Sequence, residues 1–190
     1  MQEDLASPVA PRQKRSKLWW LLAAVVFVGG GAAITIKSSD DLADAPPNSV
    51  KLDGGAKAFS LDEVRAGKPD VTLADFKGKP VVLNFFGSWC TPCLRELPDL
   101  QAVSEAYSGE VAFVGVTYND TRPGARSVLE RFGVTYPAGF DPKGEVAYNY
   151  ALVRMPTTVF ISADGKLLER VNQELTEPQL KRMIDRLFFS

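Results

Sequence analysis

The chain has 190 residues, of which 45% are hydrophobic and 24% are charged, and its formal net charge is −1. This composition is typical of a globular protein with a proper core, and the small net charge gives no indication of a nucleic-acid partner. Histidine is absent from the sequence, which excludes Ser-His and Cys-His catalysis, histidine-ligated zinc and the C-x-x-C-H haem attachment.

The first predicted element is a single transmembrane helix at residues 18–36, where no side chain is charged. A helix of this length crosses a hydrocarbon core about 30 Å thick. Basic residues precede the span between 12 and 17, and acidic residues follow it at 40, 41 and 44. Positive charge before the span predicts a cytoplasmic N-terminus and an extracytoplasmic remainder. The sequence therefore predicts a single-pass membrane protein whose chain after the span lies outside the cytoplasm.

The alternative for this segment is a cleaved signal peptide. Such a peptide has a shorter apolar region, of about 7 to 15 residues, with a small-residue cleavage site close behind it. The A-x-A match at 43–45 instead follows a polar, acidic stretch. Both interpretations place the remainder of the chain outside the cytoplasm.

Four segments follow from these patterns. The predicted organisation is a basic cytoplasmic tail at 1–17, the anchor at 18–36, an acidic linker at 37–52 and a folded domain at 53–190. The linker assignment rests on its charge and its prolines.

Within the domain, strands and helices alternate. Continuous apolar runs at 80–86 and 111–118 predict strands that are buried on both faces. Apolar residues at helical spacing predict one helix after Cys93 and a second one around 128–132. Their members are Leu94, Leu97, Leu100, Val103 and Tyr107 in the first helix, and Val128, Leu129 and Phe132 in the second.

The last elements are a hairpin and a helix. The Asp-Gly pair at 164–165 lies between two apolar stretches and predicts a β-hairpin. Thr176 and Gln179 form a T-x-x-Q capping box before a final helix that carries Leu180, Met183, Ile184 and Leu187. The predicted order β-α-β-α-β-β-α indicates an α/β fold with a central mixed sheet flanked by helices.

The only two cysteines, Cys90 and Cys93, stand in the stretch SWCTPC at 88–93. As a structural staple they would close a loop of about four residues, which contributes roughly 2 kcal/mol, against almost 5 kcal/mol for a loop of about 100 residues. As a zinc site the pair lacks the further ligands that tetrahedral zinc needs. Both interpretations are weak, and we predict no metal site and no bound cofactor.

The position of the pair favours redox catalysis. Cys90 follows a buried strand and opens a helix, where unpaired backbone N–H groups and the helix dipole favour a thiolate. We therefore expect Cys90 to lie exposed, to have a pKa below the ~8.5 of a free thiol and to be the attacking sulfur. Cys93 lies one turn further on the same face, beneath Cys90, and is placed to resolve a mixed disulfide. Pro92 suits the first turn of the helix.

Three stretches resemble the TlpA/ResA-like thiol-disulfide oxidoreductases of the thioredoxin superfamily. VVLNFFGSWCTPCLRELPDL (81–100) is similar to the active-site strand and helix of that family, and DVTLADFKGKPVVLNF (70–85) to the segment that leads into it. RMPTTVFISADGKLLERV (154–171) is similar to the cis-proline strand and the hairpin after it. The resemblance spans roughly residues 57 to 188 and implies a thioredoxin-like fold.

The resemblance also implies roles for single residues. Pro156 matches the family's cis-proline, and Met155 would offer its backbone to an incoming peptide as an added strand. Glu96 matches an active-site acid, and it is either the proton acceptor of the buried thiol or a solvated helix residue. Asn84 stands where thioredoxin itself carries a buried aspartate, a departure that favours the exported branch. Trp89 is expected to pack beside the thiols and to shield them.

With the resemblance included, the resulting prediction is an enzyme, an exported thiol-disulfide oxidoreductase that is tethered to the inner membrane of a bacterium. Cys90, Cys93 and Glu96 are its predicted catalytic residues, and the substrate-binding residues are Trp89, Thr91, Pro92, Met155 and Pro156. By resemblance, the expected partners are exported thiol or disulfide proteins, apocytochrome c in cytochrome c maturation among them, and a transmembrane electron donor. The alternatives are a general envelope disulfide oxidase or isomerase, a Cu(I)-handling module that uses the cysteines and Met155, and a thiol peroxidase.

Overall fold

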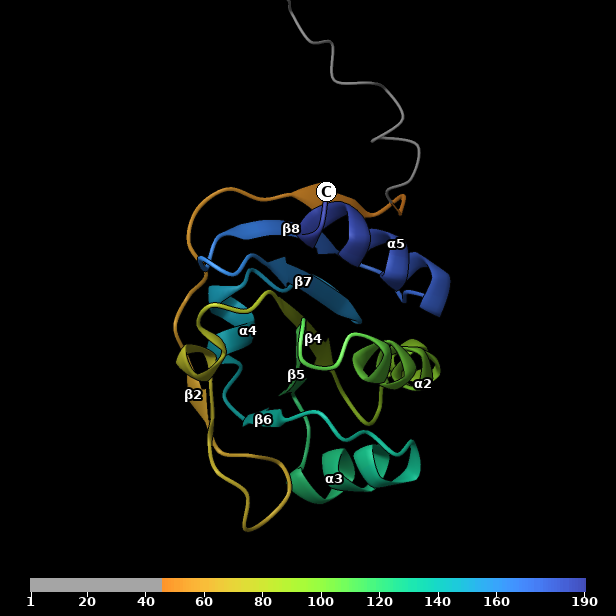
Figure 1. Cartoon of the computed structure of the whole chain (residues 1–190). Coiled ribbons are helices and arrows are strands. Elements are labelled where there is room, and N and C mark those ends of the chain that lie inside the picture. The colour runs from red at the N-terminus through yellow and green to blue at the C-terminus, as the bar shows by residue number, and fades with distance from the viewer. Residues whose placement is uncertain (1–45) are drawn as a thin grey trace, which may run out of the picture. The chain divides into compact units, whose positions relative to one another are not determined.

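The computed structural model describes residues 46–190 (Figure 1). The predicted tail and anchor, and the linker up to residue 45, lie outside this range. The elements within it are β1 (Ser49–Lys51), β2 (Ser60–Leu61), β3 (Val71–Thr72), the 3-10 helix η1 (Leu73–Phe76), β4 (Val81–Phe86), α2 (Thr91–Ala106), β5 (Ala112–Tyr118), α3 (Arg122–Arg131), β6 (Ala138–Asp141), α4 (Glu145–Asn149), β7 (Thr157–Ile161), β8 (Leu167–Val171) and α5 (Glu177–Phe188).

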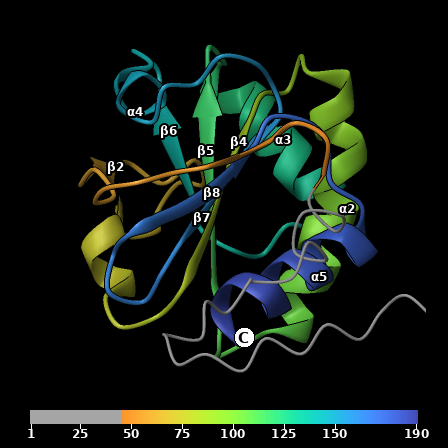
Figure 2. The ribbon, with the colours of Figure 1, turned by 90° about the horizontal axis from the view of Figure 1, so that it is seen from above.

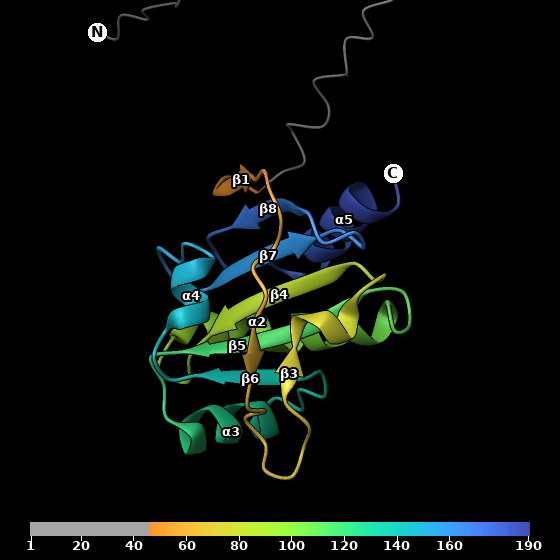
Figure 3. The same ribbon diagram turned by 90° about the vertical axis from the view of Figure 1, so that its left-hand side faces the viewer.

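The core of the domain is a six-stranded mixed sheet in the order β1-β8-β7-β4-β5-β6. β4, β5 and β6 run parallel, whereas β7 is antiparallel to β4 and to β8, as the arrows in Figure 3 show. The parallel pairs are joined through α2 and α3, because parallel neighbours need a crossover connection. A mixed sheet with a βαβ part and a terminal hairpin confirms the predicted fold class.

Helices cover both faces of the sheet (Figure 2). Side chains of α2, α3 and α5 share one buried cluster with Val82, Phe86 and Phe160 of the strands. The opposite face carries a second cluster, in which α4 and the segment around β2 and β3 pack on Val81, Leu83 and Phe85. All six residues of β4 are buried, as its continuous apolar sequence predicts.

The predicted termini of the last elements are confirmed. Gly165 in the β7–β8 turn has φ +85°, a conformation that glycine adopts at no steric cost, and its N–H donates to Ser162 O at 2.8 Å. At the start of α5, the Thr176 N–H donates to Gln179 Oε1 at 3.0 Å, as the capping box requires.

The predicted order omits six short elements, which are β1, β2, β3, η1, β6 and α4. β1 lies inside the segment 37–52 predicted as linker, yet Ser49 pairs with Val171 and Lys51 with Glu169. The sheet therefore begins before residue 53. β6 and α4 follow α3 and have only four and five residues. Elements this short show no hydrophobic period of their own, so only their pairing in the fold defines them.

Within residues 46–190, no helix has the length and hydropathy that crossing a bilayer requires. The predicted span at 18–36 lies outside the described residues.

Candidate active site

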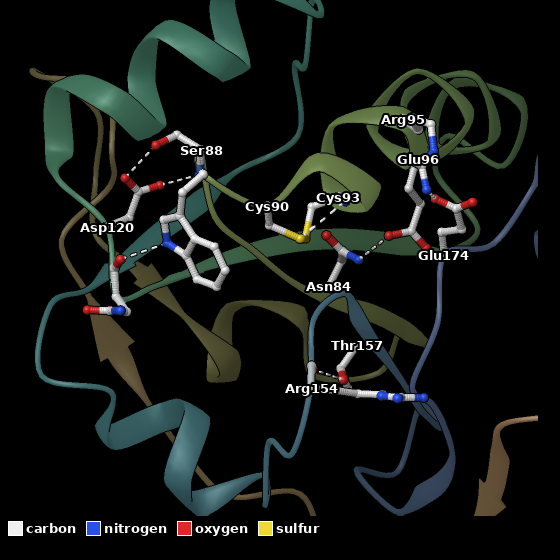
Figure 4. Close-up of a disulfide and its surroundings, with 12 residues drawn as sticks. Asn84, Ser88, Cys90, Cys93, Arg95, Glu96, Asp120, Arg154, Thr157 and Glu174 are labelled. Atoms are coloured by element: carbon white, nitrogen blue, oxygen red, sulfur yellow. Dashed lines mark hydrogen bonds and ion pairs between the residues drawn. A yellow bond between two sulfur atoms is a disulfide. The ribbon is translucent and has the colours of Figure 1, made fainter.

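The two cysteines lie where the central strand β4 gives way to helix α2, and they form a disulfide with a Cα–Cα distance of 5.2 Å (Figure 4). Cys90 is the N-cap residue of α2, and its sulfur accepts a hydrogen bond from the Cys93 N–H at 3.3 Å. Pro92 lies in the first turn, where its missing N–H leaves no acceptor unpaired. The predicted position of the pair at the helix start is confirmed.

Both cysteines are buried, although the sequence predicts an exposed Cys90. Cys93 is 1% exposed, as predicted for the deeper residue, but Cys90 is only 4% exposed. The expectation of an exposed Cys90 is therefore wrong for the disulfide form. The reason is that the residues around it close over the disulfide from two separate parts of the chain.

Beside Cys90 lies a cleft of about 480 Å³. It brings together most of the predicted substrate-binding residues, since Trp89, Thr91, Pro92 and Met155 all line it. Its remaining wall consists of Tyr118, Leu152, Val153 and Arg154, which sequence reasoning missed. Three of these directly precede Met155 in the chain, so proximity to the predicted cis-proline is the signal that could have found them.

The peptide bond between Met155 and Pro156 is cis, as the resemblance predicts. Pro156 itself is buried and does not line the cleft, whereas Met155 is partly exposed to it. The turn is closed by the Thr157 hydroxyl, which donates to Arg154 O at 2.7 Å. The loop that leads into β7 therefore presents Val153 to Met155 toward the disulfide.

Trp89 is held in place rather than packed into the core. Its side chain is 53% exposed, and its indole N–H donates to Asn119 O at 2.8 Å. The ring lies over Gly87, where an added Cβ would be 2.8 Å from the indole nitrogen. Trp89 thus forms an exposed wall of the cleft beside Cys90, in agreement with the predicted shielding position.

A second contact fixes the same loop. Both the backbone N–H and the hydroxyl of Ser88 donate to the Asp120 carboxylate, at 2.6 and 2.7 Å (Figure 4). Asp120 follows β5 and precedes α3, and an added Cβ on Gly124 in that helix would be 2.8 Å from the Ser88 hydroxyl. The sequence gives no signal for Asp120, because it lies 32 residues from Ser88.

Glu96 lies on the buried side of α2 and is only 2% exposed. Its carboxylate accepts hydrogen bonds from the Leu175 N–H at 2.9 Å and from Asn84 Nδ2 at 3.1 Å. The alternative of a solvated helix residue is therefore wrong. Burial raises the pKa of Glu96 from 4.5 to about 8, and the two hydrogen bonds oppose this shift only in part. A carboxyl group with this pKa exchanges protons near neutral pH.

Asn84 connects β4 with this carboxyl group. It is 2% exposed, and Nδ2 donates both to Glu96 and to Thr158 Oγ1 of β7, the latter at 3.0 Å. Figure 4 shows its carboxamide between the disulfide and Glu96. The site thus has a cleft on the Cys90 side and a buried polar cluster on the Cys93 side.

A helix-capping disulfide at the end of a central parallel strand, facing the loop before an antiparallel strand, is the arrangement of the thioredoxin fold. The class of protein that it defines is the thiol-disulfide oxidoreductases. The family model described as Redoxin matches residues 51–184, and the chain belongs to this family.

Similar proteins narrow the class. Thiol-disulfide oxidoreductase ResA of Bacillus thuringiensis is 30% identical over 140 residues, which cover 72% of this chain and 80% of that protein. Thiol-disulfide oxidoreductase ResA of Oceanobacillus iheyensis is 33% identical over 134 residues, or 69% of this chain and 70% of that protein. The chain is a ResA-like enzyme of the thioredoxin superfamily.

Solved structures agree with this assignment. A DsbF homologue from Corynebacterium diphtheriae has a TM-score of 0.67 at 28% identity, covering 74% of this chain and 93% of that one. A secreted Mycobacterium tuberculosis disulfide oxidoreductase homologous to Escherichia coli DsbE has a TM-score of 0.62 at 26% identity, covering 68% and 96%.

Proposed function

We propose that the chain is a membrane-tethered thiol-disulfide oxidoreductase of a bacterial envelope, which reduces disulfides in exported proteins. The single observation that carries this proposal is the Cys90–Cys93 disulfide at the start of α2, beside the cleft that ends in Met155. The relatives named as ResA support the type of reaction.

In the proposed cycle the reduced protein acts through two displacements. The Cys90 thiolate attacks one sulfur of a substrate disulfide, which forms a mixed disulfide and releases one substrate thiolate. The Cys93 thiolate then attacks the Cys90 sulfur and releases the second substrate thiolate. Two electrons pass to the substrate, and Cys90 and Cys93 end as the disulfide seen in the structure.

The proposed roles follow from the two environments. Cys90 caps α2, where unpaired backbone N–H groups stabilise a thiolate, and it borders the cleft that would receive the substrate. Cys93 is the more buried sulfur and must lose a proton before it attacks. We assign that proton to Glu96, one helical turn away, because its pKa of about 8 allows it to accept and release protons near neutral pH.

The cleft would hold the substrate as an extended polypeptide. Trp89 and Val153 are 53% and 72% exposed, so they offer apolar surface in the cleft beside Cys90. We infer that the residues around the substrate cysteine pack on these side chains, while the backbone at Met155 pairs with them as an added strand.

Tethering and location are proposed from the sequence. The uncharged span at 18–36, with basic residues before it, would place the N-terminus in the cytoplasm and residues 53–190 outside. By its similarity to ResA proteins, we propose apocytochrome c as a substrate during cytochrome c maturation. Because each turnover leaves the disulfide form, a transmembrane electron donor would then have to reduce it.

Trapping tests the proposed function. A Cys93→Ala variant lacks the resolving thiol, so we expect it to retain exported partners as mixed disulfides through Cys90, identifiable by mass spectrometry. The matched Cys90→Ala variant should retain none. Equal adducts on both variants, or adducts only with cytoplasmic proteins, would contradict the proposal.

A further inference from the structure

The Asn84 side chain has one half that is bonded and one half that is not. Nδ2 donates to Glu96 Oε2 and to Thr158 Oγ1, whereas Oδ1 has no hydrogen-bond donor among the described residues of the protein. Asn84 is 2% exposed. A buried acceptor without a partner costs about 1 to 3 kcal/mol, so its retention beside a reactive centre calls for a physical reason.

The orientation of the carboxamide is set by its bonded half. In the structure Nδ2 faces Glu96 and Thr158, and the oxygen points the other way. Asn84 shares its face of β4 with Val82 and Phe86, since side chains alternate along a strand. Both belong to the buried cluster that contains Cys93. Figure 4 shows the oxygen of Asn84 on the side of the disulfide.

The redox state of the cysteines decides whether this oxygen has a donor nearby. In the disulfide form neither sulfur carries a hydrogen, so neither can donate. In the dithiol form Cys93 carries an S–H group, which is a weak donor. Within residues 46–190 the Tyr136 hydroxyl is also buried without a hydrogen-bond partner, so it does not donate to Asn84 Oδ1.

We propose that Asn84 is a redox-dependent positioning residue, whose Oδ1 accepts the Cys93 S–H in the dithiol form while its Nδ2 holds Glu96. The inference rests on the proposed exchange through Cys90 and Cys93. It assigns to Asn84 no proton transfer of its own. The amide instead keeps the resolving thiol and the carboxyl group in fixed positions on either side of it.

The sign of the energetic effect follows directly. The unpaired oxygen destabilises the disulfide form, and the new hydrogen bond stabilises the dithiol form. Both effects favour reduction of the protein. Removal of the carboxamide should therefore shift the equilibrium toward the disulfide, which makes the protein a stronger reductant.

The equilibrium with glutathione measures this shift. For Asn84→Leu, which keeps a similar volume, we expect the equilibrium constant for reduction by glutathione to fall about fivefold, the equivalent of one net hydrogen bond. At about 30 mV per tenfold change in the equilibrium constant, the reduction potential should fall by about 20 mV. The matched control is Thr158→Val, which removes one partner of Nδ2 and leaves Oδ1 in place. We expect it to stay within about twofold of the parent.

A second measurement leaves Asn84 intact. In the Cys90→Ala protein, the S–H stretching band of Cys93 should lie at lower wavenumber than that of a free thiol in an apolar solvent, because the thiol is hydrogen-bonded. The position of this band tests the hydrogen bond from Cys93 to Asn84 even if the Asn84→Leu variant does not fold.

Three outcomes would overturn the inference. They are an unchanged equilibrium constant for Asn84→Leu, an equal shift for Thr158→Val, and a free-thiol band for Cys93. Failure of the parent protein to equilibrate with glutathione at all would instead contradict the proposed function. The two failures are therefore distinguishable.

Discussion

The two cysteines are three residues apart, yet their surroundings differ in kind. The Cys90 side borders a cleft and is shaped by backbone contacts and exposed side chains, among them Trp89 and Val153. The Cys93 side is closed and polar, with Asn84 of β4 and Glu96 of α2 both buried there. The difference indicates that capture of a substrate and its release can be altered separately by substitution.

The largest expected effect concerns Glu96 on the Cys93 side and the free energy of unfolding of the protein. The pKa of Glu96 is raised from 4.5 to about 8 in the folded protein, so the folded state binds this proton more tightly than the unfolded chain. The stabilisation is fully present below pH 4.5 and is lost as the pH rises through 8. At about 1.4 kcal/mol per pKa unit, the loss amounts to several kcal/mol.

Denaturant unfolding of the disulfide form, in which no thiol titrates, measures this loss. Between pH 5 and pH 9 (roughly the window that the shifted pKa defines), we expect the free energy of unfolding of the parent to fall relative to that of Glu96→Gln. If the free energy of unfolding changes equally with pH in the two proteins, the pKa of Glu96 is not raised in the folded state.

The second prediction concerns release of the substrate. Glu96→Gln removes the proton acceptor, so resolution of the mixed disulfide should slow by about 10²-fold, the lower range for general base catalysis. The parent rate should rise as the pH passes through about 8, where the carboxylate forms, and the variant should lose this part of the rise.

Stopped-flow exchange with a model disulfide, followed through the fluorescence of Trp89, separates the two steps. The first attack by Cys90 serves as the internal control, because Glu96 lies on the other side of the site. Equal slowing of both steps would remove the distinction between the two sides.

A smaller effect is expected on the Cys90 side. Asp120→Ala removes both acceptors of Ser88, so the loop before Cys90 loses its tie to the start of α3. We expect the first attack to slow a few-fold and the free energy of unfolding to fall by about 1 to 3 kcal/mol. The same stopped-flow assay checks the rate, and Asp120→Asn, which keeps one acceptor oxygen, should show a weaker effect. A slower resolution step with unchanged attack would contradict the expected division.

Much of this arrangement could be predicted from the sequence, and the rest could not for definite reasons. The strand β4, the helix α2 and the cis bond before Pro156 were accessible because their signals are local: an apolar run, a helical period and a motif. The burial of Glu96 depends on the Leu175 N–H, 79 residues away in the chain. The position of Glu96 on the helix does not by itself predict whether the side chain is buried.

The same reason explains the other differences. The burial of Cys90 depends on a loop that follows α4, an element too short to show a period. β1 has three residues, and only its pairing with β8 distinguishes it from the linker that its composition suggests. In both cases the local sequence carries no signal, and a contact between residues far apart in the chain determines the burial or the strand pairing.

The most direct test of the division between the two cysteines is the rate of alkylation against pH in the single-cysteine variants Cys90→Ala and Cys93→Ala. Cys90 caps α2 beside the cleft, so we expect it to titrate below the ~8.5 of a free thiol and to react faster near neutral pH. Cys93 is enclosed with Asn84 and Glu96, so its pKa should lie above that of Cys90. Faster alkylation of Cys93 near neutral pH would contradict the assignment of capture to Cys90 and of release to Cys93.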